Sequence, residues 1–218
     1  LGSVALAGPS RVGGLVEKLT PGYFALVMAS GIISIASELR DFRWLSVSLF
    51  AVCIGAYVVL LVLNTWRFVV YRHAMVDDFK DPKRAFGFFT FVAGTNVLGT
   101  RAGMEHWYTL AAWLLVISFA VWLVMGYVIP WSAVLSRSER PVVALANGTW
   151  FIWVVASQSV AVLSAGLETV FEGPRAYLAI LAVLSWSVGV FLYAASAIIV
   201  ALRIMLYELD PKDLDPPY

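Results

Sequence analysis

Long, uninterrupted apolar blocks constrain the fold of this 218-residue chain more than any other feature of its sequence. A helix that crosses the hydrocarbon core of a bilayer needs about 20 consecutive, mostly apolar residues. At least five blocks reach or approach that length. Hydrophobic residues make up 61% of the chain and charged residues 13%, and a soluble domain carries about 25% charged residues. The sequence therefore predicts an all-α integral membrane protein.

The apolar blocks and the polar segments between them predict about six transmembrane helices. Their approximate ranges are 21–37, 45–63 with a continuation toward 70, 86–104, 108–135, 142–167 and 175–206. Pro130 is expected to kink or end the fourth helix, because proline cannot continue the backbone hydrogen bonds. Residues 1–18 are expected to form a cytoplasmic N-terminal segment and residues 19–209 the transmembrane domain. Residues 210–218 are expected to form a cytoplasmic tail or a linker to a seventh helix.

The lysines and arginines are divided unevenly between the two ends of the predicted bundle. The N-terminal segment, the C-terminal tail and the connections after the second and fourth helices together carry 11 of them. The other three connections carry 4. Connections rich in lysine and arginine stay in the cytoplasm. We therefore expect both termini to be cytoplasmic, which agrees with an even number of helices.

The first, third and fifth predicted helices are richer in small and polar residues than the second, fourth and sixth. Gly, Ser, Thr, Asn and Gln occupy 21 of 55 positions in the central windows of the odd helices, and 10 of 67 in those of the even helices. Lipid offers polar groups no hydrogen-bond partner. We therefore expect three helical hairpins, with the odd helices forming an inner layer and the even helices an outer layer.

Small and polar residues of the odd helices are the candidate lining of a pore. These candidates are Ser30, Ser34, Thr90, Gly94, Thr95, Asn96, Thr149 and Gln158. For each of them, close helix packing through small residues is the alternative role. Arg101, near the end of the third helix, has two interpretations. It either attracts anions to the mouth of a pore or anchors the helix at the interface by extending its charge to water.

Ionisable residues are absent from the central part of every predicted helix. Proton-coupled pumps generally use such a residue as a relay, and an intramembrane hydrolase needs a nucleophile with a base, or a metal with ligands. His73 and His106 fall in connections on opposite sides, and the single cysteine, Cys53, lies inside an apolar block. We therefore predict no catalytic site, no metal site, no cofactor and no nucleic-acid partner. A neutral lumen, which solvates a small anion without trapping it, fits this pattern.

Several motifs in order resemble one family of membrane transporters. The first helix carries LTPGYF (residues 19–24) and MASGI (28–32), and the third carries FFTFVAGTN (88–96). The fifth carries NGTW (147–150) and VASQS (155–159), and the chain closes with DLDPPY (213–218). Together they resemble the tellurite-resistance/C4-dicarboxylate transporter family, which includes bacterial tellurite-resistance channels, yeast malate permeases and plant slow anion channels. The last motif resembles the approach to the seventh helix of that family.

The resemblance implies ten helices in five hairpins. The odd helices would ring a pore within each subunit, a phenylalanine on the ninth helix would gate it, and subunits would form a homo-oligomer, a trimer. It also implies small anionic substrates and a bacterial-type inner membrane. This sequence departs from the pattern because it has three hairpins. We therefore expect it to represent the first six helices of a longer protein and not to form a channel alone.

Two functions from different classes follow. The first is membrane transport of small anions through a neutral polar pore. The substrates would be C4-dicarboxylates such as malate, or inorganic anions such as tellurite-related oxyanions. Replacing Gln158 or Asn96 by leucine is then expected to lower anion flux. The alternative is a non-transporting helical partner or scaffold, which packs against other membrane helices or recruits cytoplasmic proteins through residues 71–85. An enzyme is not expected, because catalytic groups are lacking.

Overall fold

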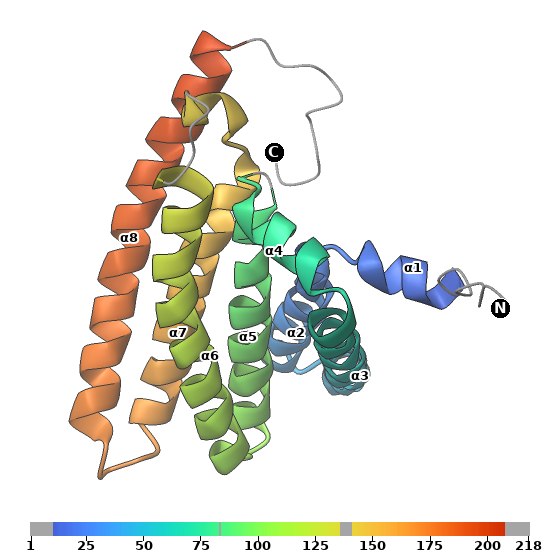
Figure 1. Ribbon diagram of the computed structural model, residues 1–218. Coiled ribbons are helices and arrows are strands. Elements are labelled where there is room, and N and C mark those ends of the chain that lie inside the picture. The colour runs from blue at the N-terminus through green and yellow to red at the C-terminus, as the bar shows by residue number, and fades with distance from the viewer. Residues whose placement is uncertain (1–10, 83, 136–140, 208–218) are drawn as a thin grey trace, which may run out of the picture.

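The computed structural model describes residues 11–82, 84–135 and 141–207, and every regular element in these ranges is helical. Six long elements form the body of the molecule (Figure 1). They are α2 (Ala25–Glu38), α3 (Arg43–Val70), α5 (Phe89–Met104), α6 (Tyr108–Ile129), α7 (Phe151–Glu168) and α8 (Arg175–Leu206). Short 3-10 turns precede three of them: η1 (Pro21–Phe24) before α2, η2 (Ala85–Phe88) before α5 and η5 (Gly148–Trp150) before α7. The predicted tail at 210–218 and most of the predicted N-terminal segment lie outside the described residues.

Five of the described helical segments are long and apolar enough to cross a membrane. They are Pro21–Glu38, Arg43–Val70, Tyr108–Ser132, Gly148–Glu168 and Arg175–Leu206. The remaining long helix, α5, is not among them, because its glycines, Asn96 and Arg101 lower its hydropathy. Its position explains how this composition is tolerated. Most residues of α5 are buried, and it packs against α2, α6 and α7, so neighbouring helices shield its polar groups from lipid.

The helices form three hairpins, arranged in two layers. Consecutive helices pack most extensively in the pairs α2–α3, α5–α6 and α7–α8, and α5 also packs against both α2 and α7. In Figure 1, α5 lies between α2 and α3 on one side and α8 on the other. The inner segments Pro21–Glu38 and Gly148–Glu168 are 39% and 50% buried over their most apolar windows, whereas each of the three outer segments is 28% buried. This arrangement agrees with the two layers that the sequence predicts.

The helix boundaries differ from the prediction in two places. Residues 71–85, expected to be a loop, contain helix α4 (Arg72–Lys80), because a buried ion pair between Asp78 and Arg67 holds this weakly apolar segment against α3. The fifth helix starts later than residue 142. Ala146 and Asn147 are extended, and the Asn147 side chain accepts the backbone N–H of Thr149. Asparagine is a preferred residue at such a helix start.

Pro130 affects the fourth helix as expected. The α-helical geometry of α6 ends at Ile129, and residues Pro130–Leu135 continue as a π-helical segment (η3). Proline removes one backbone donor and crowds the preceding turn, and such wide turns relieve this crowding within a helix.

Candidate functional site

A groove between α5 and α7 is the feature closest to the predicted polar pathway. It has a volume of about 270 Å³ and lies toward the C-terminal ends of both helices. Its lining includes Thr100 and Met104 from α5, and Val162 and Gly166 from α7. The lining contains no charged side chain. It therefore combines apolar walls with hydroxyl and backbone groups.

Regular spacing places a row of α7 residues on the open side of this helix. Val155, Ser159, Val162 and Gly166 follow one another at intervals of three or four residues, so they share one helix face. Val155 is 40% exposed and Val162 is 58% exposed. Helix α7 packs against α5, α6 and α8, and Val162 and Gly166 of this row also line the groove. The row and the groove therefore overlap, and we call the two together the open surface of α5 and α7.

Asn96 links three helices beside this surface. It is fully buried on α5, and its Nδ2 donates to Ser159 Oγ on α7 at 3.0 Å. Its Oδ1 accepts a hydrogen bond of 2.5 Å from Ser118 Oγ on α6. A buried amide must find such partners, because leaving it unsatisfied costs about 1–3 kcal/mol. Asn96 thus fixes the position of the Ser159 hydroxyl, which itself donates to Ala156 O at 2.7 Å.

Glycine allows α5 and α7 to approach closely. A Cβ atom on Gly99 would lie 2.7 Å from Leu163 Cδ2 of α7, well inside van der Waals contact. Gly94, on the α2 side of α5, has Phe24 O and Val27 within 3.4 Å of the same position. Gly94, predicted as a lining residue, is therefore placed in the contact between α5 and α2.

The predicted hydroxyl residues of α2 and α5 are bonded within the helix bundle. Ser30 Oγ donates to Leu26 O on its own helix, and Ser34 Oγ donates to Ser46 O of α3 at 2.7 Å. Thr90 Oγ1 donates to Pro21 O at 3.0 Å, which ties η1 to the start of α5. Thr95 Oγ1 lies 3.2 Å from the Tyr57 hydroxyl of α3. The structure gives each of these residues a packing partner, and their role as lining residues stays a prediction.

Thr149 and Gln158 occupy separate positions on the α7 segment. Thr149 is buried in η5, where Asn147 accepts hydrogen bonds from both its backbone N–H and its hydroxyl. Gln158 points toward the outer helix, and its Nε2 donates to Trp186 O of α8 at 3.3 Å. A Cβ atom on Gly189 of α8 would lie 2.4 Å from this nitrogen. The structure therefore does not bring Gln158 and Asn96 together.

Arg101 is fully buried, which differs from the exposed mouth position considered from the sequence. Its Nη2 lies 3.2 Å from Glu38 Oε2 and 2.9 Å from Glu105 Oε1. Its Nε donates to Ser34 Oγ at 2.9 Å, and the guanidinium lies 4.8 Å from the centre of the Phe50 ring. Two carboxylates thus neutralise Arg101, which joins α2, α3 and α5 at one end of the bundle. An anion-attracting role for Arg101 stays a prediction.

Glu105, which follows α5, takes part in the same cluster. The hydrogen bond from Arg101 lowers the pKa of Glu105 below its ordinary value, and this effect exceeds the opposing effect of burial. Arg43 reaches the second carboxylate oxygen at 3.5 Å and is 65% exposed. Glu105 is therefore paired with one buried arginine, Arg101, and one solvent-exposed arginine, Arg43.

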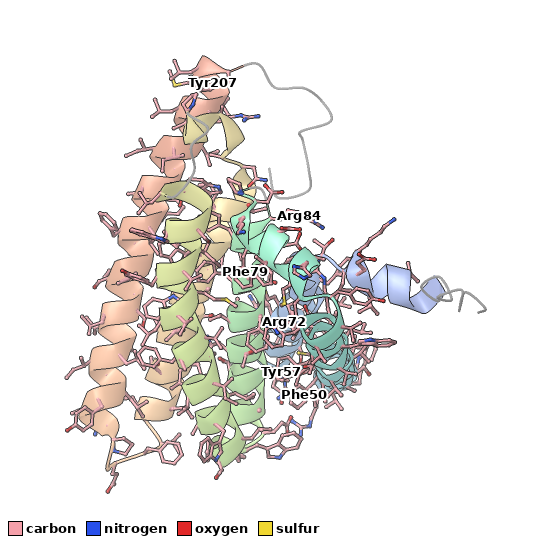
Figure 2. All side chains as sticks on the ribbon, in the orientation of Figure 1. Phe50, Tyr57, Arg72, Phe79, Arg84 and Tyr207 are labelled. Atoms are coloured by element: carbon pink, nitrogen blue, oxygen red, sulfur yellow. The ribbon has the colours of Figure 1, made fainter. Side chains whose placement is uncertain are left out.

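A second buried ion cluster lies at the opposite end of α3 and was not predicted from the sequence. Arg67 Nη2 lies 2.6 Å from Asp78 Oδ2, and Arg84 Nη1 lies 2.7 Å from Asp78 Oδ1. Arg67 also donates to the backbone oxygen of Glu17 at 3.1 Å. Figure 2 shows Arg72 and Arg84 near the two ends of α4, on this side of the bundle. The spacing of charges alone could not reveal that Arg67 is buried and paired.

These contacts define a class of protein. Polar groups are concentrated on inner helices, apolar side chains cover the outer helices, and an uncharged open surface follows α5 and α7. No group of three or more His, Cys, Asp or Glu side chains within the described residues could hold a metal ion. The chain is thus an integral membrane protein whose inner helices carry most of the polar groups.

A comparison with family models identifies the family within this class. The model for voltage-dependent anion channels (SLAC1) matches residues 18–218, nearly the whole chain, and the chain belongs to this family. This result confirms the resemblance drawn from the motifs. Searches of curated proteins and of solved structures gave no significant match. Members of the matched family are anion channels or transporters, not enzymes.

Proposed function

We propose that this protein carries small anions across the membrane along the neutral surface formed by α5 and α7. The substrates we propose are C4-dicarboxylates such as malate, or inorganic anions including tellurite-related oxyanions. The observation that carries the proposal is the bridge from Asn96 to Ser159, which positions a half-buried hydroxyl in the same row of α7 as the exposed Val155 and Val162. Thr100 supplies a second hydroxyl in the groove beside it.

The groups on this surface favour the passage of a small anion over its tight binding. Ser159 Oγ donates to Ala156 O at 2.7 Å and Thr100 Oγ1 donates to Asn96 O at 2.9 Å, so either hydroxyl would exchange a local bond for one to a passing anion. No fixed positive charge lines the groove to hold the anion. Conduction requires entry to be favourable and exit to remain easy. The buried arginine at the end of the bundle is already neutralised by Glu38 and Glu105. It therefore acts on the pathway by fixing α2 and α5 in place.

The orientation and assembly we propose rest on the sequence. Lysine and arginine are concentrated at the end of the bundle that contains α4, so this end faces the cytoplasm. Both termini then lie in the cytoplasm, and the membrane is a bacterial-type inner membrane. We also propose a trimer, as the family resemblance implies.

Anion efflux from proteoliposomes tests the function. The chain, in its full natural form, would be reconstituted, and efflux of chloride, nitrate and malate would be measured. We expect Asn96→Leu to lower efflux at least several-fold while insertion is retained, because Ser159 loses its partner. Gln158→Leu, which the sequence alone predicts to lower flux, is the matched control, since Gln158 faces α8; from this placement we now expect efflux near that of the unmodified protein.

The same assay separates the proposal from the alternative function. A protein that inserts correctly but releases none of the three anions would contradict transport and favour a helical partner or scaffold. An equal loss of efflux in both variants would locate the effect in helix packing instead of the pathway. A loss restricted to Asn96→Leu supports the surface of α5 and α7.

A further inference from the structure

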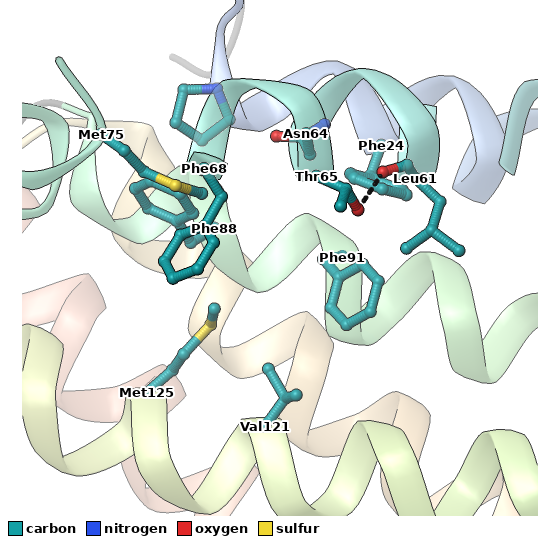
Figure 3. Close-up of a pocket in the computed structure, with 11 residues that line it drawn as sticks. Phe24, Leu61, Asn64, Thr65, Phe68, Met75, Phe88, Phe91, Val121 and Met125 are labelled. Atoms are coloured by element: carbon teal, nitrogen blue, oxygen red, sulfur yellow. Dashed lines mark hydrogen bonds between the residues drawn. The ribbon is translucent and has the colours of Figure 1, made fainter. Parts of the chain in front are cut away.

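A second groove lies on the outside of the bundle, away from the proposed pathway. It has a volume of about 250 Å³ and opens between the outer helices α3 and α6. Figure 3 shows Phe68, Met75 and Phe88 at one end of this groove and Phe24, Leu61 and Phe91 toward the other. Nearly all of its lining atoms are apolar. We call it the α3–α6 groove.

The floor of the α3–α6 groove is a rigid aromatic layer. Phe91 of α5 packs edge-on against Phe24 with ring centres 5.1 Å apart, and it stacks on Tyr57 at 6.3 Å. Phe88 stacks on Phe79 of α4 with ring centres 3.9 Å apart. The two polar lining residues of α3 are occupied, since Asn64 and Thr65 donate to backbone oxygens one turn earlier on the same helix. The groove therefore offers a mainly apolar surface, in which the Thr65 hydroxyl proton is used and Asn64 keeps one N–H of its amide.

The location of the groove determines which molecules reach it. Its two walls belong to segments that are long and apolar enough to span a membrane, Arg43–Val70 and Tyr108–Ser132, and Met75 of α4 lines one end, so lipid that surrounds these helices reaches the groove. A single hydrocarbon chain is flexible and apolar, so it can follow this groove between two helices. The charge beside the groove distinguishes a lipid from a helix of a second copy.

The charge beside one end of the groove indicates the headgroup. Helix α4 begins at Arg72, and the groove residues Phe68 and Met75 lie four residues before and three residues after it. Arg72 is exposed and makes no ion pair with any residue that the structure describes. Residues 67–84 contain five basic and three acidic residues, and Asp78 is already paired with Arg67 and Arg84. The region around Arg72 therefore favours a negatively charged group.

We propose that the α3–α6 groove binds one acyl chain of an anionic phospholipid, whose phosphate-containing headgroup contacts Arg72. Anionic lipids are concentrated in the cytoplasmic leaflet, and each lysine or arginine near that surface contributes about 1 kcal/mol of attraction. The site is distinct from the proposed anion pathway, because the two grooves share no lining residue. A bound lipid would contact both hairpins, α2–α3 and α5–α6, and would stabilise their packing beside α4.

Native mass spectrometry of the purified chain tests the groove. The chain would be titrated with phosphatidylglycerol and with phosphatidylcholine carrying the same acyl chains. We expect one phosphatidylglycerol to be retained per chain, and Val121→Trp, which fills the groove from α6, to lower this retention about tenfold. Val116→Trp is the matched control, because Val116 lies on the same helix, is 56% exposed and does not line the groove. It should retain lipid as the unmodified chain does. Val121→Phe is the second variant if the tryptophan variant is not recovered.

A second pair of variants tests the headgroup contact. Arg72→Gln should reduce the preference for phosphatidylglycerol over phosphatidylcholine about fivefold, the equivalent of about 1 kcal/mol. Arg40→Gln, an exposed arginine at the other end of α3, should leave the preference unchanged. Equal lipid loss in Val121→Trp and Val116→Trp would mean a non-specific lipid shell only. Unchanged retention in Val121→Trp, or a change of its oligomeric state with no lipid bound to the unmodified chain, would also overturn the proposal.

Discussion

Arg101 and Arg43 both bind Glu38, and replacing each of them by methionine separates the effect of burial from the effect of distance. Arg43 makes the shorter contact, with its Nη1 2.6 Å from Glu38 Oε1, but its side chain is 65% exposed. Arg101 Nη2 lies 3.2 Å from Glu38 Oε2 and its side chain is fully buried. An argument from distance alone would rank Arg43 as the more important residue. The structure predicts the opposite order.

The expected magnitudes follow from the surroundings of each guanidinium. Removing one partner of a buried ion pair costs about 3–5 kcal/mol, because the other partner is left uncompensated. Glu38 and Glu105 are 20% and 24% exposed and keep Arg43 as a partner, so we expect the low end, about 3 kcal/mol, for Arg101→Met. An exposed pair such as Arg43–Glu38 contributes about 0–1 kcal/mol.

Thermal unfolding in detergent, followed by circular dichroism, measures the difference. For a chain of this length, 1 kcal/mol corresponds to a shift in Tm of about 2–4 °C, so Arg101→Met should lower Tm by about 6–12 °C. Arg43→Met should lower it by less than about 4 °C. Arg101→Lys should fall between them, because it keeps the charge but loses the fork of donors. A loss for Arg43→Met equal to or larger than that for Arg101→Met would refute the reasoning.

Three further predictions concern pH, helix packing and the second ion cluster. The pKa of Glu105 is lowered in the folded protein, so its contribution to stability is present above the ordinary pKa of 4.5 and is lost as the pH falls through the lower folded pKa. In a plot of Tm against pH, Glu105→Gln should therefore reduce the fall of Tm at acidic pH. An unchanged fall of Tm in this variant would contradict the prediction. Gly99→Ala should lower stability by about 1–3 kcal/mol through overpacking against Leu163, whereas Gly103→Ala, which meets no atom within 4 Å, should not, as Tm values would show. Asp78→Asn leaves Arg67 buried without a full counter-charge and should cost about 3 kcal/mol or more, and a Tm equal to that of the unmodified protein would argue against a buried pair.

The fold was largely predictable because lipid imposes simple rules on sequence. Apolar blocks of about 20 residues must be helices when they cross a bilayer. Helices rich in small and polar residues must be shielded by the others. The short helix α4 was missed for the same reason, since it carries no apolar block. Its position depends on the pairing of Asp78 with Arg67, which spacing does not reveal.

The candidate site was predictable only in part. Sequence reasoning selected Asn96, and the structure places it at the junction of α5, α6 and α7. It also selected Gln158, which faces α8, because composition identifies a helix but not which of its faces a neighbour covers. The partner of Ser34 is Ser46 on α3, and that of Arg101 is Glu38, 63 residues earlier. Such pairings arise from the packing of hairpins and cannot be read from local patterns.

The location of water along the inner layer is the most direct test of the proposed pathway. Cys53 is the single cysteine and is fully buried, so cysteines introduced one at a time can be probed with a charged thiol reagent in intact membranes. Thr100→Cys, Ser159→Cys and Val162→Cys report on the open surface, and Val116→Cys reports on the lipid-facing side of α6. We predict that the reagent modifies the first three cysteines and that malate or chloride slows this reaction. We predict that Val116→Cys is not modified. Silence at all three positions of the open surface, or equal modification of Val116→Cys, would contradict a water-filled anion pathway along α5 and α7.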